Sequence, residues 1–121
     1  MEYDVVIVGG GPSGLTTAIK LKQLNSNLNI CVLEKASEIG AHILSGNVFE
    51  TRALDELIPN WKDLNPPMKT KVSKEKFLFL GKTKSLSWPT WLLPAVQKNH
   101  KNYIISLANL CRWLAEQAEA L

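Results

Sequence analysis

The fold of this chain is set near its beginning by Val5-Val6-Ile7-Val8-Gly9-Gly10-Gly11-Pro12-Ser13-Gly14. The first four residues are β-branched, a run typical of a strand buried on both faces of a parallel sheet. Residues 9, 11 and 14 form the pattern G-x-G-x-x-G, and Pro12 suits the first turn of a helix, where its missing N–H costs little. This stretch therefore predicts a strand, a tight glycine loop and the start of a helix.

Each glycine of the pattern has a separate task in holding phosphate groups. Gly9 permits the tight turn out of the strand, Gly11 lets the backbone approach a pyrophosphate, and Gly14 lets the helix pack close to the strand. The helix N-terminus then offers free N–H groups and the positive end of its dipole.

The second predicted strand ends in an acidic residue that can complete the site formed by the glycine loop. After a polar turn at residues 25–29, the apolar run Ile30-Cys31-Val32-Leu33 ends at Glu34, which lies 20 residues beyond Gly14. A carboxylate at a strand end can accept hydrogen bonds from the adenosine ribose and would repel a 2′-phosphate, which disfavours NADP. Loop and acid together predict a site for the ADP half of a dinucleotide.

The remaining chain predicts further elements. Residues 35–46 have the composition of a loop, and residues 53–58 suit a short helix. The apolar run 77–80, the polar stretch 81–85 and residues 86–88 predict a hairpin with its turn at 81–85. Apolar residues from Ile104 to Ala118 recur at helical spacing and predict an amphipathic helix over residues 103–121. In a doubly wound fold that helix leads into another parallel strand, so we expect the chain to be an incomplete fragment of a larger fold.

The composition limits the function classes. A chain of 121 residues, 45% apolar and 21% charged, suits one small globular domain. Cys31 and Cys111 lie in unlike contexts without C-x-x-C spacing, so we interpret both as small buried apolar side chains in a reducing compartment, with no metal site. No apolar run reaches the ~20 residues of a membrane span. Arginine is scarce and no binding motif appears, which argues against a nucleic-acid partner.

Several stretches resemble a known family. Residues 5–21 and Glu34-Lys35 resemble the FAD-binding fingerprint of glutathione-reductase-like flavoproteins. More narrowly, the chain resembles electron transfer flavoprotein–ubiquinone oxidoreductases in Gly40-Ala41-His42-Ile43-Leu44-Ser45-Gly46, in Arg52 to Pro59, in Phe77 to Leu80 and in Asn102 to Leu121. The resemblance covers essentially the whole chain and implies an α/β, Rossmann-like FAD-binding fold with an inserted hairpin, at the N-terminal end of a longer protein.

This resemblance implies an oxidoreductase that carries FAD and a 4Fe–4S cluster on a bacterial or mitochondrial inner membrane. Such an enzyme passes electrons from reduced electron transfer flavoprotein to ubiquinone. The family's cluster cysteines lie toward its C-terminal end, so Cys31 and Cys111 are not expected to bind the cluster. The flavin performs the chemistry, and no side chain of this chain is expected to be catalytic.

The resemblance also implies the cofactor contacts. The glycine loop would hold the pyrophosphate, Glu34 the ribose, and the loop around His42 would run beside the cofactor, although His42 alone is as easily a plain loop histidine. Arg112 would either reach the phosphates or pair with Glu116 on its own helix. The predicted cofactor-binding set is Gly9, Gly10, Gly11, Pro12, Ser13, Gly14, Glu34, Lys35, Gly40, His42, Ser45, Gly46 and Arg112. The side chain of Lys35 is expected to face solvent.

The segment 69–101 is basic, with eight lysines and the single acid Glu75. The family binds the membrane surface through an apolar hairpin in this region, and lysines near it would meet anionic lipid while tryptophans suit the headgroup level. The candidate membrane contacts are Phe79, Leu80, Trp88, Trp91, Leu92 and Leu93. Composition alone favours the alternative, a hairpin that covers the protein's own core beside a solvated loop.

Two other functions stay open. The strand–helix–strand unit fits other glutathione-reductase-like flavoproteins, of geranylgeranyl-reductase or hydroxylase type, equally well. The chain would also suit a truncated domain without activity of its own, since the flavin ring would lack most of its pocket. The predicted organisation is a partial FAD-binding domain over 1–121, with the cofactor unit in 1–46, the basic hairpin segment in 69–101 and the helix in 103–121.

Overall fold

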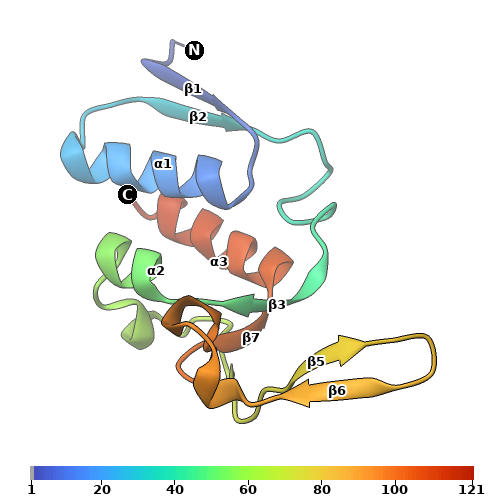
Figure 1. Cartoon of the computed structure of the whole chain (residues 1–121). Coiled ribbons are helices and arrows are strands. Elements are labelled where there is room, and N and C mark those ends of the chain that lie inside the picture. The colour runs from blue at the N-terminus through green and yellow to red at the C-terminus, as the bar shows by residue number, and fades with distance from the viewer. Residues whose placement is uncertain (1) are drawn as a thin grey trace.

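The computed structural model describes residues 2–121 and begins with a strand–helix–strand unit (Figure 1). Its elements are β1 (Val5–Val8), α1 (Pro12–Leu24) and β2 (Ile30–Leu33). The two strands pair in parallel, with Val5 opposite Ile30 and Val8 opposite Leu33. The unit predicted from the glycine loop and its flanking apolar runs is confirmed.

A second, antiparallel sheet is formed by β3 (Ser45–Phe49), β4 (Thr70–Lys71) and β7 (Tyr103–Ser106), with β7 in the centre. The helix α2 (Arg52–Leu57) follows β3, and α3 (Leu107–Glu119) follows β7 without a loop. Figure 1 shows α1 and α3 stacked between this sheet and the parallel pair. The layers therefore run sheet, helix, helix and sheet, with α1 against the parallel pair, α3 against the antiparallel sheet, and the two helices packed on each other.

The core lies where the three helices meet. Its buried members are Leu15, Ile19, Leu54, Ile58, Trp61, Met68, Ile105, Leu110, Cys111, Trp113 and Leu114. The indole N–H of Trp113 donates a 2.9 Å hydrogen bond to the carbonyl of Leu64, so the buried ring leaves no polar atom unpaired. Burial of Cys111 confirms its interpretation as a small core residue, and burial raises the pKa of its thiol. Cys31 is only partly buried.

The terminal helix starts later than its spacing predicts. Residues 103–106 form β7, and α3 begins at Leu107, where the hydroxyl of Ser106 accepts a 3.4 Å hydrogen bond from the N–H of Asn109. Ile104 therefore lies in a strand, because its backbone segment pairs with both β3 and β4. The spacing of apolar residues along one segment cannot reveal its pairing with distant strands. Such pairing decides where a strand forms more than the intrinsic preference of its residues does. For the same reason the predicted loop over 35–46 ends early, since β3 already begins at Ser45.

The parallel pair is covered on one face only. Val5 and Ile7 are half-buried against the helices, whereas Val6 and Val8 are 53% and 85% exposed. The prediction that β1 is buried on both faces is therefore wrong for the described residues. The helices reach only one side of this two-stranded sheet, and its other side remains open.

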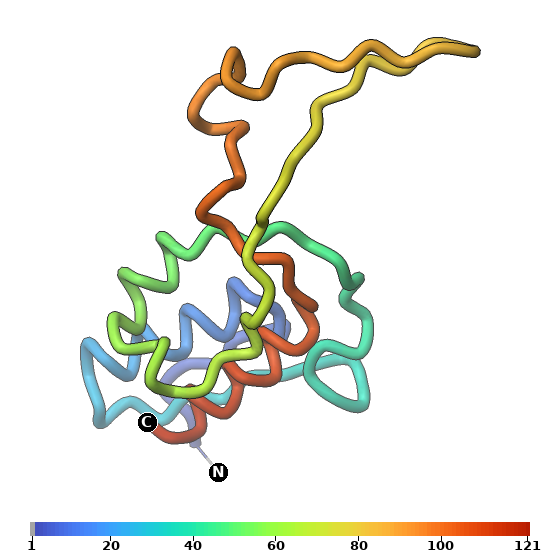
Figure 2. Tube along the Cα trace, turned by 90° about the horizontal axis from the view of Figure 1, so that it is seen from below, coloured from blue at the N-terminus to red at the C-terminus, as the bar shows by residue number. Residues whose placement is uncertain are grey.

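The segment between β4 and β7 projects from the body as a hairpin (Figure 2). Its strands are β5 (Phe77–Leu80) and β6 (Ser85–Trp88), and the N–H of Gly81 closes the turn on the carbonyl of Lys84 at 2.8 Å. The predicted hairpin is confirmed, with its second strand one residue longer. Short 3₁₀ turns, η1 (Trp61–Leu64), η2 (Thr90–Leu92) and η3 (Ala95–Gln97), complete the chain. Over residues 2–121 the helices are too short or too polar to pass through a bilayer.

Candidate dinucleotide-binding site

The glycine loop connects β1 to α1 and has the backbone that its pattern predicts. Gly9 has a φ of +109°, a conformation that residues with a side chain rarely adopt. A Cβ atom added to Gly14 would collide with the carbonyl oxygen of Gly9. Gly9 therefore makes the turn, and Gly14 lets the helix pack directly against it.

Gly11 faces open space. A Cβ atom added there would meet no other atom within 4 Å. Gly11 is also the N-cap of α1, and no side chain among residues 2–121 caps that helix. The first N–H groups of α1 and the positive end of its dipole are thus left for an anion. An uncapped helix start behind a side-chain-free backbone fits the pyrophosphate of a dinucleotide.

Glu34 is bonded to the glycine loop. Its Oε2 accepts a 2.7 Å hydrogen bond from the N–H of Gly10, and its Oε1 accepts a 2.8 Å bond from the N–H of Ala36. The bonds from Ala36 and Gly10 hold the pKa of Glu34 below its ordinary value, and His42 adds a smaller favourable charge interaction. The carboxylate is therefore ionised at neutral pH and lies beside the loop, as the spacing from Gly14 predicts.

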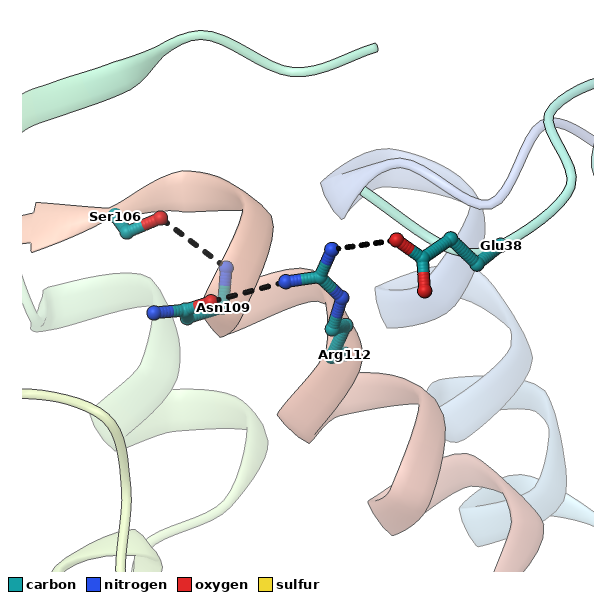
Figure 3. A network of polar contacts seen from close by, with 4 residues as sticks. All are labelled: Glu38, Ser106, Asn109 and Arg112. Carbon is teal, nitrogen blue, oxygen red and sulfur yellow. Dashed lines mark hydrogen bonds and ion pairs between the residues drawn. The ribbon is translucent and has the colours of Figure 1, made fainter. Parts of the chain in front are cut away.

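The loop after Glu34 is tied to α3 by an ion pair (Figure 3). Nη2 of Arg112 lies 3.0 Å from Oε1 of Glu38, and Nη1 donates to Oδ1 of Asn109 at 3.1 Å. The alternative prediction, a pair between Arg112 and Glu116, is wrong, because Glu38 and Asn109 hold the guanidinium. Contact of Arg112 with the phosphates stays a prediction.

A glycine supports the same loop at its other end. Gly40 has a φ of +86° and lies so close to α3 that an added Cβ would press on the backbone of Ala108, 2.8 Å from its carbonyl oxygen. The loop therefore approaches α3 without a side chain between the two backbones. His42 lies in this loop with an exposed side chain.

The other predicted site residues lie in the first turn of α1, in the loop after β2 and at the start of β3. Pro12 is the first residue of α1, and the carbonyl of Ser13 accepts hydrogen bonds from the hydroxyls of Thr16 and Thr17. Lys35 is exposed, as expected. Ser45 and Gly46 are exposed at the start of β3, and their contact with a cofactor stays a prediction.

Sequence reasoning missed three residues of this region. Ala36 binds the carboxylate of Glu34 through its backbone, Glu38 holds Arg112, and the side chain of Ile39 lies so near Gly10 that a Cβ there would collide with it. A backbone donor carries no residue-type signal, and an exposed acid is indistinguishable in sequence from any solvated acid. Only the approach of the loop to α1 and α3 reveals these roles.

Known proteins match this chain in two ways. A family model described as an NAD(P)-binding Rossmann-like domain matches residues 7–69, which contain the loop and Glu34. Curated relatives named electron transfer flavoprotein-ubiquinone oxidoreductase match essentially the whole chain. They include proteins from Oryza sativa subsp. japonica (54% identical, 100% of this chain, 21% of the relative), Pseudomonas aeruginosa (52%, 100% and 23%) and Caenorhabditis elegans (56%, 98% and 20%).

These matches confirm the resemblance found in the motifs, and the chain spans about a fifth of the length of the curated relatives. The matched family model covers more than half of the chain and includes the turn at Gly9, the open backbone at Gly11 and the carboxylate of Glu34. This chain therefore belongs to the family of NAD(P)-binding Rossmann-like domains.

Proposed function

We propose that this chain is the FAD-binding N-terminal part of a flavin and iron–sulfur oxidoreductase that passes electrons from electron transfer flavoprotein to ubiquinone. The observation that carries the proposal is the open backbone at Gly11 beside the ionised Glu34, which together offer a place for a pyrophosphate and for a ribose. The names of the relatives, which match the chain over its length, support this flavin enzyme among dinucleotide-binding proteins.

The residues of this chain would bind and orient the cofactor. The loop of residues 9–14 would hold the pyrophosphate through its backbone N–H groups, and Glu34 would accept the ribose hydroxyls. Arg112 and residues 40–46 would lie along the cofactor, with Lys35 at the rim. Bound FAD supplies the electron-transfer chemistry, and the 4Fe–4S cluster would be bound by a part of the longer protein outside this chain.

The partners follow from the same proposal. Electron transfer flavoprotein would deliver electrons and ubiquinone would accept them at a bacterial or mitochondrial inner membrane. The hairpin segment 69–101 would meet the membrane surface. Support comes from the exposure of Phe79, Leu80, Trp88, Trp91 and Leu92, with Leu93 partly covered, all beside the lysine-rich stretch.

The test of cofactor binding is the visible spectrum of the purified protein. We expect bound flavin near one per chain in the wild type and little in a Gly11→Val variant, whose side chain would occupy the pyrophosphate position. Glu50→Gln serves as control, because Glu50 is an exposed acid paired with Arg52 at 3.7 Å, outside the glycine loop. A colourless wild type that recovers no flavin on reconstitution would reject FAD binding by this chain on its own and would favour the truncated domain.

Electron transfer flavoprotein supplies the test of activity. The test uses the longer protein that contains this chain, because the chain alone is expected to be inactive. Mixing that protein with reduced electron transfer flavoprotein is expected to bleach its flavin absorbance, and ubiquinone to restore it. A longer protein that keeps FAD but does not react with reduced electron transfer flavoprotein would instead be a flavoprotein of the reductase or hydroxylase type.

A further inference from the structure

The hairpin β5–β6 has two unlike faces, because side chains alternate along each strand and Phe77 pairs with Trp88. One face carries Phe77, Phe79, Leu86 and Trp88, and we call it the aromatic face. The other carries Leu78, Leu80, Ser85 and Ser87, and we call it the serine face. Every one of these residues is exposed. The aromatic face has no polar side chain, whereas half of the serine face is polar.

The aromatic face is a continuous surface. The ring of Phe79 meets that of Phe77 edge-on at 5.4 Å and that of Trp88 at 6.0 Å between centroids. Within the described chain, β5 and β6 pair only with each other, and Figure 2 shows them extending away from the body. A two-stranded sheet is marginal in water by itself, and a contiguous exposed apolar patch marks an interaction surface.

The charges around the hairpin indicate what this surface meets. Lys82 and Lys84 occupy the turn, and Lys76 directly precedes β5. The nearby acid, Glu75, is held by the backbone and side-chain N–H groups of Asn99 at 3.1 Å. An apolar face surrounded by lysines is complementary to a bilayer leaflet whose headgroups are anionic.

The turn also decides how the hairpin can lie. Entry of the tip into the hydrocarbon would bury Lys82 and Lys84 and would strip water from the unpaired N–H and C=O groups on both strand edges. A hairpin that lies along the surface avoids both costs, because its tip and edges stay among headgroups and water. Its aromatic face can then enter the interfacial layer, where tryptophan is favoured.

We propose that the hairpin lies flat on an anionic leaflet, with the aromatic face toward the lipid and with Lys82 and Lys84 at the headgroups. This inference rests on the membrane contact in the proposed function and narrows it. Phe79 and Trp88 enter the lipid, whereas Leu80 faces away from it.

The first test compares neighbouring residues on opposite faces. The holoprotein is floated with vesicles of phosphatidylcholine and phosphatidylglycerol. Phe79→Ser is expected to lower the partition coefficient roughly tenfold, and Leu80→Ser to change it less than about twofold. Exposure alone predicts the reverse order, since Leu80 is 78% and Phe79 53% exposed. Equal losses, or a larger loss from Leu80→Ser, would overturn the proposed orientation.

The second test uses the tip. The double variant Lys82→Gln, Lys84→Gln is expected to bind vesicles containing phosphatidylglycerol at least about tenfold more weakly and pure phosphatidylcholine unchanged. Tip-first insertion predicts tighter binding to both vesicles, and that result would overturn the proposal. An unchanged flavin spectrum in every variant shows that the fold is retained.

Failure of the orientation can be separated from failure of the proposed function. If the wild type floats and the Phe79 and Leu80 variants do not differ, the flat orientation is wrong but the membrane contact stands. If the wild type floats with neither vesicle, both the membrane contact and the orientation are wrong. Cofactor binding is read independently from the flavin absorbance.

Discussion

The backbone N–H of Gly10 donates a 2.7 Å hydrogen bond to the carboxylate of Glu34, which follows it by 24 residues. Together with the 2.7 Å bond from the N–H of Gly9 to the carbonyl of Leu33, it connects the glycine loop after β1 to the end of β2. The second carboxylate oxygen is held by the N–H of Ala36. The acid proposed to bind the ribose is thus oriented by backbone donors of the protein itself, which lowers the ordering cost of ligand binding.

Glu34→Gln is expected to weaken FAD binding about tenfold or more. The amide keeps one acceptor oxygen, so it cannot serve Gly10, Ala36 and ribose hydroxyls as a carboxylate does, and charge-assisted bonds are the stronger ones. Titration of the apoprotein with FAD, followed by quenching of flavin fluorescence, measures the dissociation constant. An unchanged constant, with Glu50→Gln also unchanged, would remove Glu34 from the site.

Lowering the pH is expected to reduce the free energy of unfolding of the wild type more than that of the Glu34→Gln variant. The bonds from Ala36 and Gly10 depress the pKa of Glu34 in the folded state. A depressed carboxyl pKa stabilises the fold above the unfolded-state pKa, and that stability is lost as pH falls through the folded-state pKa. Urea midpoints at neutral pH and below the usual carboxyl range measure the difference. The pKa of Asp55 is also lowered, by the indole N–H of Trp61. Asp55 is present in both proteins, so its contribution to the acid-induced loss of stability cancels in the comparison. Parallel acid responses in the two proteins would contradict the prediction.

Two glycines of one loop are expected to respond differently to alanine. Gly14→Ala places a methyl group against the carbonyl of Gly9 and is expected to cost about 1–3 kcal/mol in free energy of unfolding. Gly11→Ala adds its methyl to open space at an N-cap with a φ of −83°, so its cost is that of a poorer N-cap residue, about 0.5 kcal/mol. Gly11→Ala should nevertheless weaken FAD binding. Urea unfolding of the apoprotein and FAD titration separate the two effects; equal losses of stability would refute the distinction.

Gly40→Ala is expected to destabilise the fold more than Gly46→Ala. Both glycines have a φ of +86°, so alanine carries a strain of about 1 kcal/mol at either position. Only at Gly40 does the added methyl also meet the backbone of Ala108. Thermal unfolding of both variants measures the difference, and Gly46→Ala is the matched control for backbone strain. Equal shifts in melting temperature would show that the loop yields at Ala108.

Glu38→Gln and Arg112→Gln are expected to change FAD affinity in opposite directions. The pair is exposed, so either variant should lose less than about 1 kcal/mol of stability. If the guanidinium binds phosphates, Arg112→Gln weakens FAD binding. Glu38→Gln frees the guanidinium from its ion pair and therefore strengthens FAD binding. FAD titration at low and high salt measures the affinity of both variants. Equal weakening in the two variants would show that Arg112 acts only by holding the loop of residues 35–44.

The hairpin β5–β6 shows that local sequence pattern predicts secondary structure but not its placement in the fold. The apolar run before Gly81 and the short stretch after the polar turn predicted its two strands, because strand pairing across a short turn depends on neighbours in sequence. The same composition suited a hairpin packed on the core equally well. Whether Phe77–Trp88 folds back or projects depends on the chain before and after it, and the structure shows it projecting.

The sequence by itself determined the strand–helix–strand unit, the turn at Gly9 and the approach of Glu34 to the loop. Each follows from short-range chemistry: β-branched residues, glycine without a Cβ, and a fixed spacing along one parallel connection. Tertiary structure alone decided that residues 103–106 are a strand, that Val8 faces open space and that Glu38 holds Arg112, 74 residues away. Those features arise from contacts between distant segments, whose energies are set by packing geometry and leave no periodic trace in the sequence.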